Sequence, residues 1–251
     1  PKEYRLLVDE YHNLLKIYSY RKEAVEGVLE HFNEFKSYCF MSATPIAMDF
    51  KPDALKDVEE YIADWKHIEP LMILPYQTNK PYNLAANLIE TYRRQGYIER
   101  GELKSYEAYF FINSVTEIKK ILEYTHLTND DCRIICADED KNRRTLGEYQ
   151  ISSSTDAPKK FNFITSKSFE GVDFYSETGI CYVVSNIHNE HTLLSVDMDI
   201  PQIAGRIRNT NNPFRNLVVH IFNTRPKDYY ENYGKAKKEI EKELEYAKER
   251  A

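Results

Sequence analysis

Short apolar runs alternate along the chain with longer segments whose apolar residues recur every three or four positions. Short runs of this kind are typical of buried strands, and the longer period is that of a helix with one face on a core. We expect strands at 5–8, 38–41, 108–113, 132–136, 160–165, 180–184 and 217–222, and a further element beginning at 68–74. We expect helices at 22–35, 53–65, 81–95, 116–124 and 226–250, the last strongly charged. This alternation predicts an α/β fold in which helices cover both faces of a mostly parallel sheet.

The expected elements fall into two units. The 33 positions from Asp9 to Ser42 fit one strand–helix–strand crossover. The pattern then changes near residues 66 to 80, which we interpret as a domain boundary. We therefore expect a first unit at 1–67 and a second at 68–251, in which the polar stretch 152–158 forms a loop.

Composition narrows the class of protein. The 251 residues are 42% hydrophobic and 29% charged, which is enough material for one or two domains with real cores. The apolar runs are too short to span a membrane, and no signal or transit peptide is visible. The four cysteines form no CxxC pair and lie in strand-like runs, so we interpret them as buried hydrophobic residues. We expect a soluble protein of the reducing cytoplasm.

The charge of the chain bears on its partners. The net charge is −6 and the isoelectric point is near 5.7. A protein that binds polyanions over a broad surface needs dense lysine and arginine to neutralise phosphates. Any contact of this chain with nucleic acid is therefore expected to be local.

Polar residues that could take part in catalysis or ligand binding follow the first two expected strands. Asp9 and Glu10 would stand at the carboxyl end of the first strand, where ligands bind in open α/β folds. One carboxylate can hold a phosphate-bound magnesium ion while its neighbour orients an attacking water, although a solvated turn is an equal alternative for the pair alone. Ser42 and Thr44 follow the next strand, and their hydroxyls can bond to His12 or Asp9. By itself, Ser-Ala-Thr-Pro also suits a helix cap or turn.

The second unit carries three further polar segments. Ser114 follows the strand at 108–113, where it suits either a phosphate contact or, more simply, a helix N-cap. Thr165 ends the strand at 160–165 and leads to Gly171 and Asp173, and glycine there permits a close approach of the backbone.

The third segment is Gln-Ile-Ala-Gly-Arg-Ile-Arg, from Gln202 to Arg208. A guanidinium group is always charged and pairs with phosphate in a planar fork, so Arg206 and Arg208 suit a phosphate contact. The alternative is a pair of exposed helix charges. Because residues two apart on a helix point about 200° away from each other, both reach one phosphate only if the helix begun near Pro201 is distorted or ends there.

In this order, the segments Leu6 to His12 (Leu-Leu-Val-Asp-Glu-Tyr-His), Met41 to Pro45, Thr165 to Asp173 and Gln202 to Arg208 resemble motifs II, III, V and VI of DExH-type superfamily 2 helicases, in the wider DEAD/DEAH-box group. The segment 110–114 looks like motif IV. The glycine-rich phosphate loop of motif I, which should precede these segments, is missing from the sequence. The resemblance implies that 1–67 is the C-terminal remnant of a first RecA-like domain and that 68–251 is a second RecA-like domain of the P-loop NTPase type.

The resemblance also implies an ATP-dependent helicase or translocase whose partner is DNA or RNA and whose cofactors are ATP and Mg²⁺. ATP would bind between the two lobes, with Asp9 on magnesium and Glu10 positioning the water. Arg206 and Arg208 would act as catalytic arginine fingers, and Ser114 and Thr165 would hold the nucleic-acid backbone. The residues implied in ATP binding or coupling are His12, Ser42, Thr44, Gly171, Asp173 and Gln202.

The segment from Gln202 departs from the commonest motif VI, since Asn209 occupies the place of the last arginine and Arg208 stands one position earlier. A Gly-Arg-x-Arg ending looks more like the herpesvirus-type origin-binding helicases. Two other classes stay open: a nucleic-acid-binding or regulatory module that does not hydrolyse ATP, and an unrelated α/β domain. Because the phosphate loop is missing, we expect these 251 residues to be inactive alone. We expect no membrane partner. We also expect a possible dimer, formed through the surface that the missing part would cover.

Overall fold

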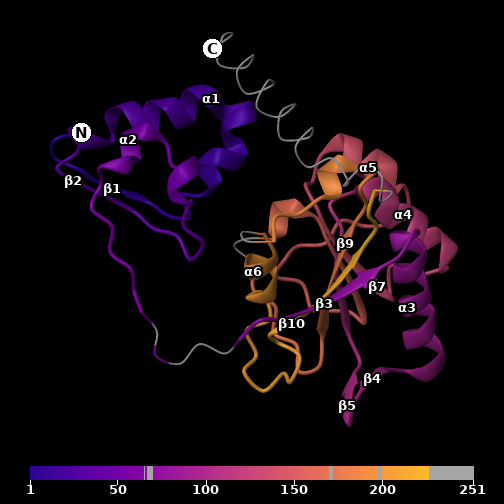
Figure 1. Ribbon diagram of the computed structural model, residues 1–251. Helices are drawn as coiled ribbons and strands as arrows, with labels where there is room; N and C mark the ends of the chain where they lie inside the picture. Colours follow the sequence, from indigo (N-terminus) through magenta and orange to yellow (C-terminus); the bar gives the residue numbers. More distant parts are fainter. Residues whose placement is uncertain (65, 67–69, 170–171, 197–198, 226–251) are drawn as a thin grey trace. The chain divides into compact units, whose positions relative to one another are not determined.

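The computed structural model describes residues 1–64, 66, 70–169, 172–196 and 199–225, without the side chains of residues 19 and 20. The chain divides into two compact units, Pro1–Glu69 and Pro70–Ala251, and each is described by itself (Figure 1). The helix expected at 226–250 and the candidate residue Gly171 lie outside the described residues.

The first unit is built on two parallel strands and the helix between them. Its elements are β1 (Arg5–Val8), α1 (Asn13–His31), β2 (Ser37–Phe40) and the short α2 (Asp53–Lys56). The two strands pair in parallel along their whole length, with Val8 opposite Phe40. Helix α1 has a kink at Arg21, whose φ and ψ are not helical, and its second part begins at the predicted residue 22. The preceding part from Asn13 was not predicted, and it adds Leu14 and Ile17 to the core of this unit. That core consists of Tyr11, Leu14, Val25, Phe32, Ile46 and Leu55.

The prediction of a helix over 53–65 is wrong. Helix α2 ends at Lys56, and Tyr61 and Ile62, which an amphipathic helix would bury, are 83% and 87% exposed. Acidic residues crowd what would be the C-terminal half of that helix, where the helix dipole favours cations instead. Without a core to bury its apolar side chains, a short helix is not stable in water.

The second unit is an α/β domain with six parallel strands. The strand order is β3-β10-β9-β6-β8-β7, and every pairing is parallel. The strands are β3 (Met72–Gln77), β6 (Ala108–Phe111), β7 (Cys132–Ile135), β8 (Phe161–Ile164), β9 (Ile180–Ser185) and β10 (Leu217–Phe222). The predicted fold class, a parallel sheet flanked by helices, is confirmed, and its architecture is consistent with a RecA-like fold.

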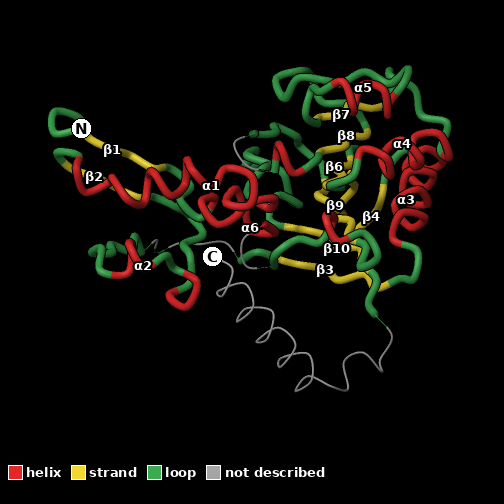
Figure 2. Tube along the Cα trace, turned by 90° about the horizontal axis from the view of Figure 1, so that it is seen from above, coloured by secondary structure: helices red, strands yellow, loops and turns green. Residues whose placement is uncertain are grey.

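Helices lie on both faces of this sheet, as Figure 2 shows from above. They are α3 (Pro81–Gln95), α4 (Val115–Tyr124), α5 (Asp140–Leu146) and α6 (Asp199–Ala204). Successive strand residues point to opposite faces, so Phe110 packs in the core under α3 and α4, whereas Phe111 packs in the core under α6. Both phenylalanines are fully buried, which explains why strand β6 is a continuous apolar run.

Local signals explain which elements were predictable. Helix α3 has the predicted bounds, because Pro81 occupies its first turn and Gly96, at φ 86°, ends it in the left-handed conformation. The hairpin of β4 (Ile98–Arg100) and β5 (Leu103–Ser105) was not predicted, since strands of three residues give no periodicity. Helix α5 was missed for a similar reason: Leu146 is its one fully buried side chain.

Gly179, which directly precedes β9, leads to a stability prediction. A Cβ atom on Gly179 would lie 2.5 Å from Cε2 of Tyr109 and 2.7 Å from Oγ of Ser176. Tyr109 is fully buried and donates a hydrogen bond to Glu107, so its ring has little room to move. We expect Gly179→Ala to destabilise the second unit by about 2–3 kcal/mol, as overpacking of a core does, in a urea-unfolding measurement.

The control for this prediction is Gly27→Ala in α1, where a new Cβ would meet no atom within 4 Å. That change should leave the second unit unaffected and stabilise the helix by up to about 1 kcal/mol. Equal effects of the two substitutions would contradict the close approach at Gly179.

The expectations about membrane spans and about the cysteines can be compared with the structure. None of the helices in the described ranges is both long and apolar enough to cross a membrane. All four cysteines are free thiols, and Cys132, Cys136 and Cys181 are buried as expected, whereas Cys39 on β2 is exposed. Burial in apolar surroundings raises the pKa of the Cys136 thiol to about 11, so this thiol stays protonated at neutral pH.

Candidate functional site

The carboxyl ends of β1 and β2 bring three of the candidate residues together. Because the strands are parallel and in register, the chain leaves both at the same edge, where the Tyr11 amide donates to the Met41 carbonyl at 3.0 Å. His12 is fully buried there, and its Nδ1 shares a hydrogen bond of 2.7 Å with Oγ of Ser42. Oγ1 of Thr44 lies 3.4 Å from the same nitrogen. The hydroxyl–histidine contact that the strand pattern predicted is therefore present.

Glu10 completes this group through an unusual backbone conformation. Its φ is 50°, in the left-handed region that residues other than glycine rarely adopt. This turn brings Oε2 of Glu10 to 3.3 Å from His12 Nδ1, and that oxygen is buried without a hydrogen-bond partner in the described structure. Strained backbone of this kind persists where surrounding contacts hold it, and such residues cluster at functional sites. Residues Glu10, His12, Ser42 and Thr44 are called the acid–histidine group below.

Asp9 lies beside this group but faces solvent. Its Oδ1 accepts a hydrogen bond of 3.0 Å from the Glu10 amide. The described residues contain no set of three or more histidine, cysteine or acidic side chains that could hold a metal by themselves. A magnesium ion bound with a nucleotide usually takes one or two carboxylates and completes its shell with phosphate oxygens and water. The exposed Asp9 carboxylate suits that role.

At the carboxyl edge of the second unit, Ser114 and Thr165 are engaged within the fold. Ser114 caps helix α4 by accepting a hydrogen bond from the Glu117 amide at 3.4 Å, which is the simpler of the two alternatives that its sequence position allows. The Thr165 side chain is 6% exposed and its amide donates to the Ile135 carbonyl at 3.0 Å. Both side chains are mostly buried, so any ligand at this edge would contact the backbone of the loops after β6 and β8 before either hydroxyl group.

Asn113 is a residue that we did not single out from the sequence. Its Oδ1 accepts a hydrogen bond from the Ser166 amide at 3.2 Å, and its Nδ2 donates to the His191 carbonyl at 2.6 Å. One side chain thus ties together the loops that follow β8 and β9. The signal was available in the sequence as a polar residue at the end of an otherwise apolar strand, but nothing in the sequence indicates the two loops that it connects.

A second group of candidate residues forms over the sheet face that α6 covers. Arg208 Nε donates to Asp173 Oδ1 at 2.8 Å, and Arg206 Nη1 lies 3.9 Å from the same oxygen. Arg206 is 6% exposed and also donates to the carbonyl oxygens of Gln202 and Val172, at 2.8 and 3.3 Å. Its Nη2 lies 3.3 Å from Oε1 of Gln202. Residues Asp173, Gln202, Arg206 and Arg208 are called the arginine group below.

The condition for both arginines to reach one anionic group, that the helix begun near Pro201 ends there, is met. Helix α6 ends at Ala204, and the segment beyond it pairs with the chain at Phe174 through an isolated β-bridge to Ile207. The Phe174 amide donates to the Arg206 carbonyl at 2.7 Å, and the Arg208 amide donates to the Phe174 carbonyl at 2.9 Å. Residues two apart in an extended segment point to the same side, which explains why both guanidinium groups reach Asp173.

The two groups belong to different units of the chain. The acid–histidine group offers a carboxylate next to a buried imidazole, which suits the orientation of a water molecule. The arginine group offers guanidinium donors, which suit an anionic oxygen. When the sequence is compared with known protein families, no family matches it, and no curated protein matches it either.

Proposed function

We propose that this chain is part of an ATP-dependent helicase or translocase of superfamily 2, which hydrolyses ATP between two RecA-like lobes while it moves on DNA or RNA. The observation that carries the proposal is the acid–histidine group, in which the turn at Glu10 brings a carboxylate to 3.3 Å from a histidine that is bonded to Ser42 at 2.7 Å. A hydrolase of this kind needs a positioned carboxylate and a link from it to the rest of the motor. The arginine group on a parallel α/β sheet adds support.

In the proposed mechanism, the Glu10 carboxylate orients the attacking water, and the Asp9 carboxylate would hold the magnesium ion that accompanies ATP. When bound, that ion would neutralise negative charge on the phosphates. His12 couples the position of the Glu10 carboxylate to Ser42 and Thr44, which lie in the segment that follows β2. Arg208, with Arg206 behind it, stabilises negative charge that develops on the transferred phosphoryl group.

The proposal needs a phosphate loop, and none is present among the 251 residues. We therefore expect this chain alone to hydrolyse ATP negligibly. The same chain, joined to a preceding segment that carries the phosphate loop, should hydrolyse ATP faster when single-stranded DNA or RNA is added. Steady-state phosphate release with and without each polymer measures both expectations.

The outcomes separate the proposal from its rival. If the joined protein binds nucleic acid but releases no phosphate under any of these conditions, the chain is a binding or regulatory module and the helicase proposal is wrong. Turnover by the 251-residue chain alone, stimulated by nucleic acid, would show that ATP is held without a phosphate loop.

We also expect the 251-residue chain to bind nucleic acid weakly and without regard to base sequence. Its net charge is −6, and the hydroxyls of Ser114 and Thr165 are buried, so few phosphate contacts are available. Fluorescence anisotropy with two labelled single strands of unrelated sequence measures this at physiological salt. Tight binding that discriminates between the two strands would mean that the chain reads base edges.

A further inference from the structure

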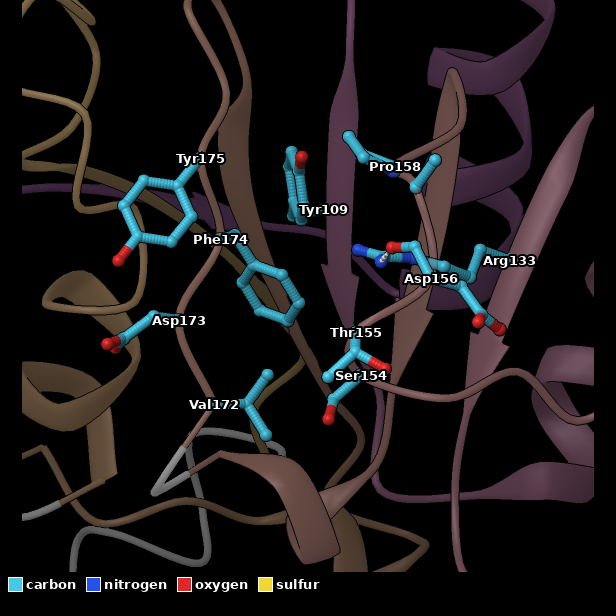
Figure 3. Close-up of a pocket in the computed structure, with 11 residues that line it drawn as sticks. Tyr109, Arg133, Ser154, Thr155, Asp156, Pro158, Val172, Asp173, Phe174 and Tyr175 are labelled. Carbon is cyan, nitrogen blue, oxygen red and sulfur yellow. Dashed lines mark hydrogen bonds between the residues drawn. The ribbon is translucent and has the colours of Figure 1, made fainter.

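A cavity of about 430 Å³ lies on the second unit and is lined by the loop 154–158, by residues 172–175 and by side chains of the sheet. Figure 3 shows Arg133 of β7 and Tyr109 of β6 on the sheet side of the cavity. In this view the Phe174 ring lies between Arg133 and Asp173. This volume is within the range of small-molecule sites. Of the residues that line it, the proposed helicase function uses only Asp173.

Arg133 is the unusual member of the lining. It is a charged residue in the buried strand β7, and it is 2% exposed. Its Nε donates to Oδ1 of Asn162 at 3.0 Å, and its Nη1 donates to the backbone carbonyl of Asp156. Its third nitrogen, Nη2, is buried and has no hydrogen-bond partner among the residues that the structure describes. Figure 3 shows the guanidinium group directed from β7 toward Tyr109 and Phe174.

No carboxylate of the described residues forms an ion pair with this guanidinium group. The Asp156 carboxylate accepts a hydrogen bond from the Ser153 amide at 2.8 Å instead. Asp173, on the cavity wall, is already paired with Arg208. Burial consequently lowers the pKa of Arg133 from its ordinary value, although an arginine stays charged at neutral pH. A buried charge without a counter-ion is costly, and buried polar groups are nearly always hydrogen-bonded.

The remaining walls combine carbon surface with a few hydroxyls. The Phe174 ring centroid lies 5.3 Å from the Arg133 guanidinium carbon and 5.1 Å from the Tyr109 ring centroid. Val172 and Pro158 add apolar surface, and Ser154 and Thr155 add hydroxyl groups. One unpaired guanidinium nitrogen suits a single charged oxygen better than a polyphosphate, which needs several donors, and the apolar walls suit a carbon skeleton.

We infer that this cavity is a binding site for a small organic anion, in which a carboxylate of the ligand accepts a hydrogen bond from Arg133 and an apolar body packs against Phe174. The carboxylate of the ligand would be the counter-ion of the Arg133 guanidinium group, which has none among the described residues. The inference is independent of the helicase proposal, because it needs neither a phosphate loop nor the first unit.

Benzoate is the probe that tests this site, with benzyl alcohol as its neutral counterpart and inorganic phosphate as an anion without an apolar body. Calorimetric titration of the 251-residue chain gives the three affinities, and amide shifts in two-dimensional NMR locate the site. We expect benzoate to bind on the order of tenfold more tightly than either control, as a hydrogen bond to a charged group implies. The shifted amides should belong to 154–158 and 172–175.

The matched variants are Arg133→Met and Arg144→Met, since Arg144 is an exposed arginine of α5 outside the cavity. Arg133→Met should weaken benzoate binding on the order of tenfold and remove the preference over benzyl alcohol, whereas Arg144→Met should change neither. Thr155→Trp, on the exposed loop, narrows the cavity without removing a bond of Arg133 and should also weaken benzoate binding. It decides the question if Arg133→Met does not fold.

Three results would overturn the inference: no binding at millimolar benzoate, equal affinities for benzoate and either control, or amide shifts confined to residues outside the cavity. Full benzoate affinity in a folded Arg133→Met variant would also overturn it. None of these results bears on ATP hydrolysis, so the two proposals stand or fall separately.

Discussion

Replacing Glu10 by glutamine is expected to lower nucleic-acid-stimulated ATP turnover by on the order of a hundredfold to ten-thousandfold, in the protein that includes a phosphate loop. Glutamine keeps the shape of the side chain but cannot accept a proton or hold the water with a negative charge. Because Glu10 already adopts its left-handed backbone in the folded chain and glutamine changes no torsion, the melting temperature should stay nearly constant. Phosphate release and a thermal melt measure the two quantities.

The matched control is Glu30→Gln, which changes the same functional group at an exposed position on α1 of the same unit. It should leave both turnover and melting temperature unchanged. If Glu10→Gln keeps full turnover, Glu10 holds His12 in place but does no chemistry, and the acid–histidine group no longer supports a hydrolase.

Most of the sheet of the second unit was predictable because strands β6 to β9 are buried on both faces. A strand such as β10, whose predicted bounds agree with the structure, reads in the sequence as an apolar run interrupted only by His220. Such a run needs helices on both sides, so it also predicts the layers. Strand order was not predictable, because β9 and β10 lie between β3 and β6 only through contacts made across the whole domain.

The candidate residues could be found in the sequence because they follow strands, but their geometry could not. Parallel strands in register bring Ser42 near His12, and this much the strand pattern predicts. The positive φ of Glu10 has no signal in the sequence, since glutamate rarely adopts it and the surrounding contacts impose it. The buried charge of Arg133 was visible as an arginine inside an apolar strand, yet its unpaired nitrogen depends on the loop 154–158.

The two arginines of the arginine group differ in burial, and the sequence alone treats them as equivalent. Arg206 is 6% exposed and bonds to Gln202 and Val172, so most of its hydrogen-bonding capacity is used inside the domain. The Arg208 side chain is 48% exposed and bonds to Asp173 through Nε. An exposed guanidinium group can turn toward a phosphate at little cost, whereas a buried one cannot. Arg208 is therefore the better candidate for the finger, and Arg206 for its support.

We expect Arg208→Ala to lower ATP turnover of the phosphate-loop-containing protein by about a hundredfold or more, as loss of a charge contact in the transition state does. Its melting temperature should hardly change, because an exposed ion pair contributes little to stability. Arg206→Ala should also lower turnover, but it should destabilise the second unit by about 2–3 kcal/mol, since it removes charged hydrogen bonds to buried carbonyl groups. Turnover and urea unfolding of both variants, with Arg144→Ala as the exposed control, measure these effects.

The comparison of the two variants decides which arginine acts on ATP. A loss of turnover in Arg208→Ala without a loss of stability would assign the finger to Arg208, one position earlier than in the commonest motif VI. If Arg208→Ala instead keeps full activity while Arg206→Ala loses it, Arg206 is the only finger. Asp173 would then serve to hold Arg208 away from the nucleotide, and the shifted position of the last arginine would have a structural cause: the β-bridge between Phe174 and Ile207, which fixes both side chains on one side of the segment.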